Sequence, residues 1–149
     1  MTEHQRLPIV SLAARVILGL LFLYAASLKL VDLPTFASSI EGYRITPSEW
    51  SPMIALAVPS VEVVVGLALV AGLHARGAAL LSAAMLIAFS AAIAQAMIRG
   101  INIDCGCFGA SSPQKADSLA LLRNSALLLL AVAVLAKPIA PWARSRPES

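Results

Sequence analysis

The sequence predicts an all-α fold, a four-transmembrane-helix bundle with a short interfacial helix between helices 1 and 2. Three observations predict it: of 149 residues 59% are hydrophobic, only 13% are charged, and the mean hydropathy is +0.84. Soluble domains average about 45–50% apolar and about 25% charged residues. Disorder is excluded as well, because disordered chains are poor in apolar residues. The length fits one membrane-embedded domain, residues 1–149.

Four long apolar runs supply the helices, at residues 9–28, 53–73, 78–98 and 119–136. Each holds about 18–21 residues, and at about 1.5 Å per residue this length crosses a hydrocarbon core of roughly 30 Å. Pro59 lies inside the second run, where neighbouring helices can accommodate a kink. A cleaved signal peptide is the alternative for the first run, but Arg15 within it and its length favour a span.

The connections between the runs differ in length and character. The first, at about residues 29–51, places Phe36, Ile40 and Tyr43 on one helical face, which predicts a short helix on the membrane surface with Trp50 near the interface. The second, residues 72–77, is tight and predicts antiparallel neighbours. The third, at about residues 99–118, is polar and contains both cysteines of the chain.

The charges bear on orientation and on partners. Four spans place the N-terminus, the second connection and the C-terminus on one side. Apart from Arg15 within the first span, five Lys and Arg residues fall on each side. Acidic residues gather on the second side, so we expect cytoplasmic termini and an external cysteine connection. The net charge is +3, but the basic residues are scattered and aromatic residues make up only 5%, so no nucleic-acid partner is expected.

The candidate chemistry lies in the third connection, at Cys105 and Cys107. Three interpretations remain: buried small apolar side chains, half of a tetrahedral metal site, or a redox dithiol. The redox dithiol is favoured, because both cysteines lie outside the spans and a disulfide between residues two apart closes a small, strained ring. Strained, exposed disulfides are the labile or catalytic ones. No resident metal is expected.

The residues around the two cysteines affect the turn that the pair can form and the pKa of its thiols. Gly106 and Gly109 supply the backbone freedom that a tight turn needs. Asp104 raises the pKa of a neighbouring thiol, whereas Arg99 or Lys115 folded nearby would lower it.

Polar residues within the spans are functional candidates, because an unpaired charge in a bilayer is costly. Glu62 and Arg15 are predicted to form an ion pair between the first two spans, with a proton or quinone site as the alternative. Lys29 and Arg99 are interpreted as snorkelling residues at helix ends. Tyr24 and Gln95 are expected to form hydrogen bonds between helices, with the lining of a cavity as the alternative. Arg123 and Asn124, at the opening of the fourth span, complete the set of intramembrane polar candidates.

These residues carry a family resemblance. The segment Gly100-Ile101-Asn102-Ile103-Asp104-Cys105-Gly106-Cys107-Phe108-Gly109 resembles the Cys-Gly-Cys-Phe-Gly loop of the methylamine-utilisation MauE family, a branch of the DoxX-like membrane proteins. Three further stretches agree with the family pattern, namely Arg15 through Gly19-Leu20-Leu21-Phe22 to Lys29-Leu30, Pro59-x-x-Glu62-x-x-x-Gly66, and Leu122-Arg123-Asn124. The similarity covers essentially the whole chain in order.

The resemblance implies a multi-pass protein of the bacterial inner membrane that works with a thioredoxin-like periplasmic partner. Its exported clients would be disulfide-bonded proteins, with the light subunit of methylamine dehydrogenase as the named case. The protein would then be a thiol–disulfide oxidoreductase using Cys105 and Cys107. The branch also resembles the quinone-linked class of DsbB and vitamin K epoxide reductase, but the C-x-x-C motif of that class is absent here. A quinone therefore stays an open alternative, and no cofactor is firmly implied.

Two other classes of function stay open at this point. A non-catalytic membrane subunit that anchors or assembles a redox complex would not need its cysteines. A carrier of a small ligand or metal would lose its cargo when the cysteines are replaced. Substitution of the cysteines separates both alternatives from disulfide exchange.

Overall fold

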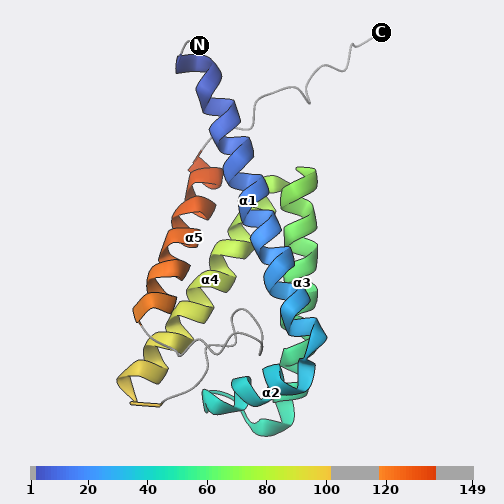
Figure 1. Ribbon diagram of the computed structural model, residues 1–149, viewed down its shortest axis with the longest axis vertical. Helices are drawn as coiled ribbons and strands as arrows, with labels where there is room; N and C mark the ends of the chain where they lie inside the picture. The colour runs from blue at the N-terminus through green and yellow to red at the C-terminus, as the bar shows by residue number, and fades with distance from the viewer. Residues whose placement is uncertain (1–2, 102–117, 137–149) are drawn as a thin grey trace.

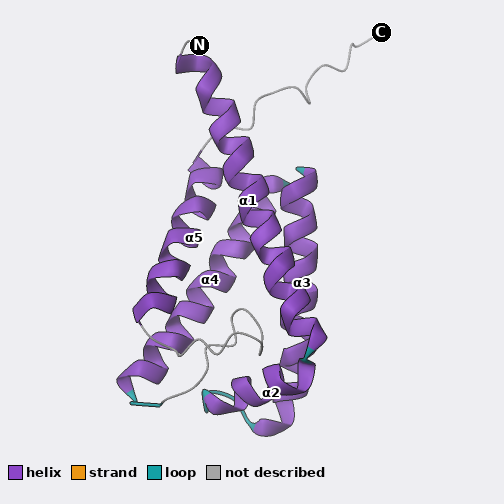
Figure 2. Ribbon diagram, viewed as in Figure 1, coloured by secondary structure: helices purple, strands orange, loops and turns teal. Residues whose placement is uncertain are grey.

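The computed structural model describes residues 3–101 and 118–136 of the chain. Every regular element within these two ranges is helical (Figures 1 and 2). The elements are α1 (Glu3–Val31), α2 (Leu33–Gly42), the short 3-10 helix η1 (Ser48–Trp50), α3 (Ser51–Ala71), α4 (Ala75–Ile98) and α5 (Ser118–Ala136). Four stretches are long and apolar enough to cross a membrane, at Ile9–Val31, Ser48–Ala71, Ala75–Ile98 and Ser118–Ala136. The predicted all-α fold with four spans is confirmed.

The helices run alternately up and down, as Figure 1 shows. The start of α1, the α3–α4 turn and the end of α5 lie at one end of the bundle. The opposite end holds α2, the end of α4 and the start of α5. In the bundle α1 packs along α3, α4 packs along α5, and α2 packs on α3. This arrangement places the ends of the four spans on the sides that the sequence predicts.

Buried and exposed side chains are distributed as in a protein that lies in a bilayer. Leu18, Leu69 and Ala131 are fully buried in the main core, which joins α1, α3, α4 and α5. Large apolar residues also cover the outside: Val64 is 66% exposed and Leu129 is 70% exposed. Soluble monomers rarely expose apolar surface on this scale. A hydrocarbon environment removes the cost, so the spans are built to face lipid.

The contact between α1 and α3 depends on two glycines. A Cβ atom added to Gly19 would lie 2.9 Å from the carbonyl oxygen of Gly66, and one added to Gly66 would lie 2.9 Å from the carbonyl oxygen of Gly19. Small residues at such positions let two transmembrane backbones approach closely. This contact also fixes the register between α1 and α3, because it places Gly19 and Gly66 at the same depth in the bundle.

The connection between α1 and α3 is helical over much of its length. The Asp32 carboxylate accepts a hydrogen bond from the Thr35 backbone N–H at 3.2 Å and so caps α2. Phe36 on this helix is buried, while Ile40 and Tyr43 are half-buried. A short helix therefore occupies the predicted stretch, and its position at the membrane surface stays a prediction.

Several helix boundaries differ from the sequence expectation. Helix α1 continues to Val31, so Lys29 belongs to this helix and not to the first connection. The α3–α4 turn is shorter than predicted, because Gly72 and His74 take positive φ angles of 77° and 48° and α4 begins at the next residue. Gly77 consequently lies inside α4. Pro59 is buried in α3, which remains one continuous helix across it.

Candidate functional site

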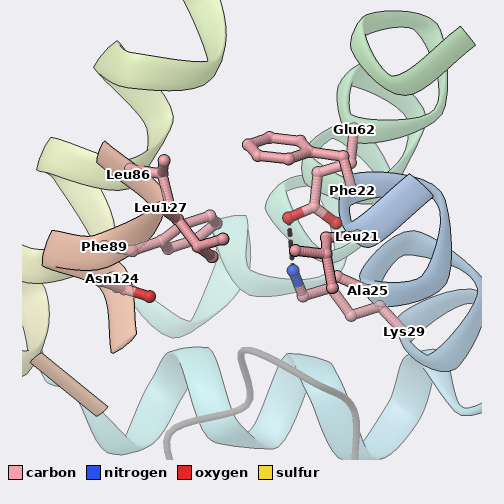
Figure 3. Close-up of a pocket in the computed structure, with 9 residues that line it drawn as sticks. All are labelled: Leu21, Phe22, Ala25, Lys29, Glu62, Leu86, Phe89, Asn124 and Leu127. Atoms are coloured by element: carbon pink, nitrogen blue, oxygen red, sulfur yellow. Dashed lines mark hydrogen bonds and ion pairs between the residues drawn. The ribbon is translucent and has the colours of Figure 1, made fainter. Parts of the chain in front are cut away.

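A buried ion pair joins α1 to α3 (Figure 3). The Lys29 ammonium donates a hydrogen bond to Glu62 Oε1 at 2.5 Å. Lys29 is 1% exposed and Glu62 is 2% exposed, so neither charge reaches solvent. Charges inside a membrane are expensive unless they pair, and they mark functional sites by default. The Lys29–Glu62 pair is therefore the centre of the candidate site.

The direction in which helical side chains lean explains why these two residues meet. Glu62 lies four residues before Gly66 and hence at the depth of Leu23 on α1. Lys29 lies six residues further along α1, an axial offset of about 9 Å. Helical side chains tilt toward the N-terminus of their own helix. Because α1 and α3 are antiparallel, Lys29 and Glu62 lean toward each other and close this offset.

Two aromatic rings complete the surroundings of the ammonium. Lys29 Nζ lies 5.0 Å from the centre of the Phe89 ring on α4 and 5.4 Å from that of Phe36 on α2. A cation within about 6 Å of a ring centre is attracted by the negative face of the ring, and desolvation strengthens the attraction. Four helices, α1 to α4, thus converge on a single ammonium group.

A cavity of about 30 Å³ adjoins the pair. Figure 3 shows it between the pair and Asn124 of α5, and its other walls are apolar. Glu62 Oε2 and Asn124 Nδ2 are buried without a hydrogen-bond partner among the described residues. A space of this size, with an acceptor and a donor in its wall, suits one water molecule. The site therefore combines a buried ion pair with an acceptor and a donor that have no partner among the described residues, in an otherwise apolar bundle.

The predicted pairing of Arg15 with Glu62 is wrong. Arg15 lies on α1 eight residues before Leu23, about 12 Å from the level of Glu62, and its side chain leans further away from that level. Its guanidinium lies instead beside the position that a Cβ atom would take on Gly72, at the α3–α4 turn. The snorkelling interpretation of Lys29 is also wrong, because this side chain turns inward and is fully buried.

The other polar candidates are spread over the bundle. Tyr24 is 56% exposed on the outside of α1 and does not line the cavity. Gln95 is half-buried in α4, and its Oε1 has no hydrogen-bond partner in the part of the chain that the structure covers. Arg99 is exposed at the end of α4, as expected of a residue at a helix end, and Arg123 is half-buried in α5. Of this group, only Asn124 lines the cavity beside the ion pair.

The cysteine motif lies outside the described residues. This holds for Asp104, Cys105, Gly106, Cys107, Phe108 and Gly109 alike. The segment 102–117 connects the end of α4 to the start of α5, and these helix ends lie at the same end of the bundle as α2 (Figure 1).

Sequence reasoning missed the aromatic part of the site. Phe36 is predicted only as a member of an apolar face, and Phe89 is not singled out at all. The i, i+4, i+7 spacing did locate the Phe36 side of α2. No local pattern marks Phe89, because its proximity to Lys29 depends on how α4 packs against the other helices.

Four apolar helices with a lipid-facing surface and a buried ion pair define a multi-pass membrane protein. Within that class, the chain belongs to the MauE family. The model of the family described as methylamine utilisation protein MauE matches residues 7–137.

Three curated relatives agree, and each is called methylamine utilization protein MauE. The protein of Paracoccus denitrificans is 40% identical over 128 residues, covering 85% of this chain and 69% of the relative. That of Paracoccus versutus is 34% identical over 138 residues, covering 92% and 73%. That of Methylorubrum extorquens is 34% identical over 138 residues, covering 91% and 74%. No solved structure is significantly similar to the chain.

Proposed function

We propose that this protein is a membrane component of methylamine utilisation that exchanges disulfides with a thioredoxin-like partner through Cys105 and Cys107. The exchange would support the maturation of disulfide-bonded exported proteins. One observation carries the proposal: the two cysteines of the chain, separated only by Gly106, lie in the connection between two spans. The printed names of three relatives supply the methylamine context.

The exchange needs no reagent besides the two sulfur pairs. A thiolate of one pair attacks a disulfide sulfur of the other, which forms a mixed disulfide and releases one thiolate. The second thiolate of the attacking pair then attacks the mixed disulfide and frees the second sulfur of the attacked pair. Two electrons move to the attacked pair, whose released sulfurs take up two protons, while the attacking pair becomes a disulfide. The chemistry runs in either direction, according to the reduction potentials of the two pairs.

The topology of the bundle supports an external place for this reaction. The end of α4 and the start of α5, between which the cysteines lie in the sequence, are at the opposite end of the bundle from the start of α1 (Figure 1). With a cytoplasmic N-terminus, the cysteines would face the periplasm, where disulfides form and persist. A thioredoxin-like domain could then reach them without entering the membrane.

Replacing one cysteine at a time tests the proposal. In cells that express the partner and a client, we expect either Cys105→Ser or Cys107→Ser to accumulate a mixed disulfide, because the resolving sulfur is missing. Client maturation should fall in both variants to the level of the double variant. Non-reducing electrophoresis and mass spectrometry detect the adduct. The chain has no other cysteine, so any adduct identifies its own position.

The double variant Cys105→Ser/Cys107→Ser is the matched control, since it keeps the same size and polarity without any thiol. Full client maturation in both single variants, with no adduct in either, would overturn the exchange mechanism. That result would instead support a non-catalytic membrane subunit.

A further inference from the structure

A second and larger cavity lies between α2, residues 43–46, α3 and α4. Its volume is about 150 Å³, and its walls include Phe36, Tyr43, Ile54, Val58 and Phe89. It adjoins the ion-pair site, because Phe36 and Phe89 also flank the Lys29 ammonium.

Size and lining indicate what this cavity can accept. An apolar cavity of about 150 Å³ in a protein core is large enough to hold a benzene ring. Aromatic walls favour a flat ring, since aromatic pairs gain energy from stacked or edge-to-face contacts. None of the described residues that line the cavity is charged. They offer a charged guest nothing to offset the loss of its hydration, so they favour a neutral guest.

One polar group in the wall is unused. Thr46 Oγ1 is buried without a hydrogen-bond partner among residues 3–101 and 118–136. Two other residues of the wall carry a hydroxyl: that of Ser39 already donates to the Thr35 carbonyl oxygen at 3.0 Å, and Tyr43 takes part in an interaction of its own. A buried group without a partner destabilises a structure. A guest that accepts one hydrogen bond at the Thr46 end of the cavity removes this cost.

We propose that this cavity binds a neutral, lipophilic ring compound that carries a carbonyl group. The ring lies among Phe36, Tyr43 and Phe89, and the carbonyl oxygen accepts a hydrogen bond from the Thr46 hydroxyl. A lipid acyl chain would fill the apolar space but leave that hydroxyl without a partner. The site goes beyond disulfide exchange, because no step of that exchange involves these residues. The guest contacts Phe36 and Phe89, the two rings that flank the Lys29 ammonium, so its binding changes the surroundings of the ion pair.

Two matched probes test the proposal on the full chain in phospholipid nanodiscs. The first is para-fluoroacetophenone, and the second is para-fluoroethylbenzene, which has nearly the same shape but no carbonyl. Fluorine NMR titration gives the affinity of each, with empty nanodiscs to subtract partition into lipid. We expect the wild-type protein to prefer the ketone by about three- to tenfold, the value of one hydrogen bond.

Two hydroxyl deletions locate the hydrogen bond. Thr46→Val should abolish the preference, while Ser39→Ala should keep it, because the Ser39 hydroxyl is already used by its own helix. Ala92 also lines the cavity, and Ala92→Phe should fill the space and abolish binding of both probes. If that variant does not fold, Val58→Phe fills the same space from α3.

Three results would overturn the proposal. Equal affinities of the two probes for the wild-type protein would indicate a purely apolar guest such as an acyl chain. An unchanged preference in Thr46→Val would remove the assigned hydrogen bond. Binding that survives in a folded cavity-filling variant would place the probes elsewhere. Because every readout is binding, none of these results depends on the cysteines.

Discussion

Glu62→Gln is expected to lower the free energy of unfolding by about 3–5 kcal/mol, the cost of removing one partner of a buried ion pair. The variant leaves the Lys29 ammonium 1% exposed with no carboxylate beside it. The rings of Phe36 and Phe89 offset only part of this loss, since a cation–π contact contributes about 0.5–2 kcal/mol. Titration with sodium dodecyl sulfate from mixed micelles, followed by circular dichroism, measures the change.

A double-mutant cycle shows whether Lys29 and Glu62 stabilise the fold through their interaction or independently of each other. Lys29→Met/Glu62→Gln should recover most of the lost stability, because replacing both buried charges is far less costly than stranding one. Arg15→Met is the matched control on the same helix, and its effect should add to that of Glu62→Gln without coupling. Coupling of Glu62 to Arg15, with none to Lys29, would contradict the assigned pair.

Enlarging Gly66 is expected to separate α1 from α3. A Cβ atom at this position would lie 2.8 Å from Leu23 Cγ and 2.9 Å from the Gly19 carbonyl oxygen. The second contact is with backbone, so a helix has to shift. We expect Gly66→Ala to cost about 1–3 kcal/mol, the usual range for overpacking, and Gly66→Val to cost more. The same detergent titration measures both.

Gly77→Ala is the control for this series, since a Cβ atom at Gly77 meets nothing within 4 Å. Inside α4 it should stabilise by roughly 0.5–1 kcal/mol through helix propensity. If Gly66→Ala and Gly77→Ala gave equal effects, the close approach of α1 and α3 would be refuted.

The fold could be predicted from the sequence because the bilayer imposes simple rules. Four apolar runs of membrane-spanning length locate α1, α3, α4 and α5 to within a few residues. The amphipathic spacing around Phe36 locates α2. Helix ends are less certain, and α1 extends past the predicted boundary at residue 28 to Val31. Because of this extension Lys29 lies within a span and not, as the sequence predicted, in the first connection.

The candidate site could be predicted only in part. Glu62 is identifiable because a carboxylate inside an apolar run needs a partner. Depth counted from helix ends suggested Arg15, but the register depends on the Gly19–Gly66 contact, and the lean of helical side chains then selects Lys29. Phe89 and the cavity beside Thr46 depend on how α2 and α4 pack, which no local pattern encodes.

Labelling of intact cells with a membrane-impermeant maleimide tests the central claim most directly. Because Cys105 and Cys107 are the only cysteines, all label on the purified chain reports on them. A protein that cycles on the outer face should take up little label before mild reduction and full label afterwards, without lysis. Label that appears only after the cells are lysed, or that is complete without any reduction, would contradict an external pair cycling between disulfide and dithiol.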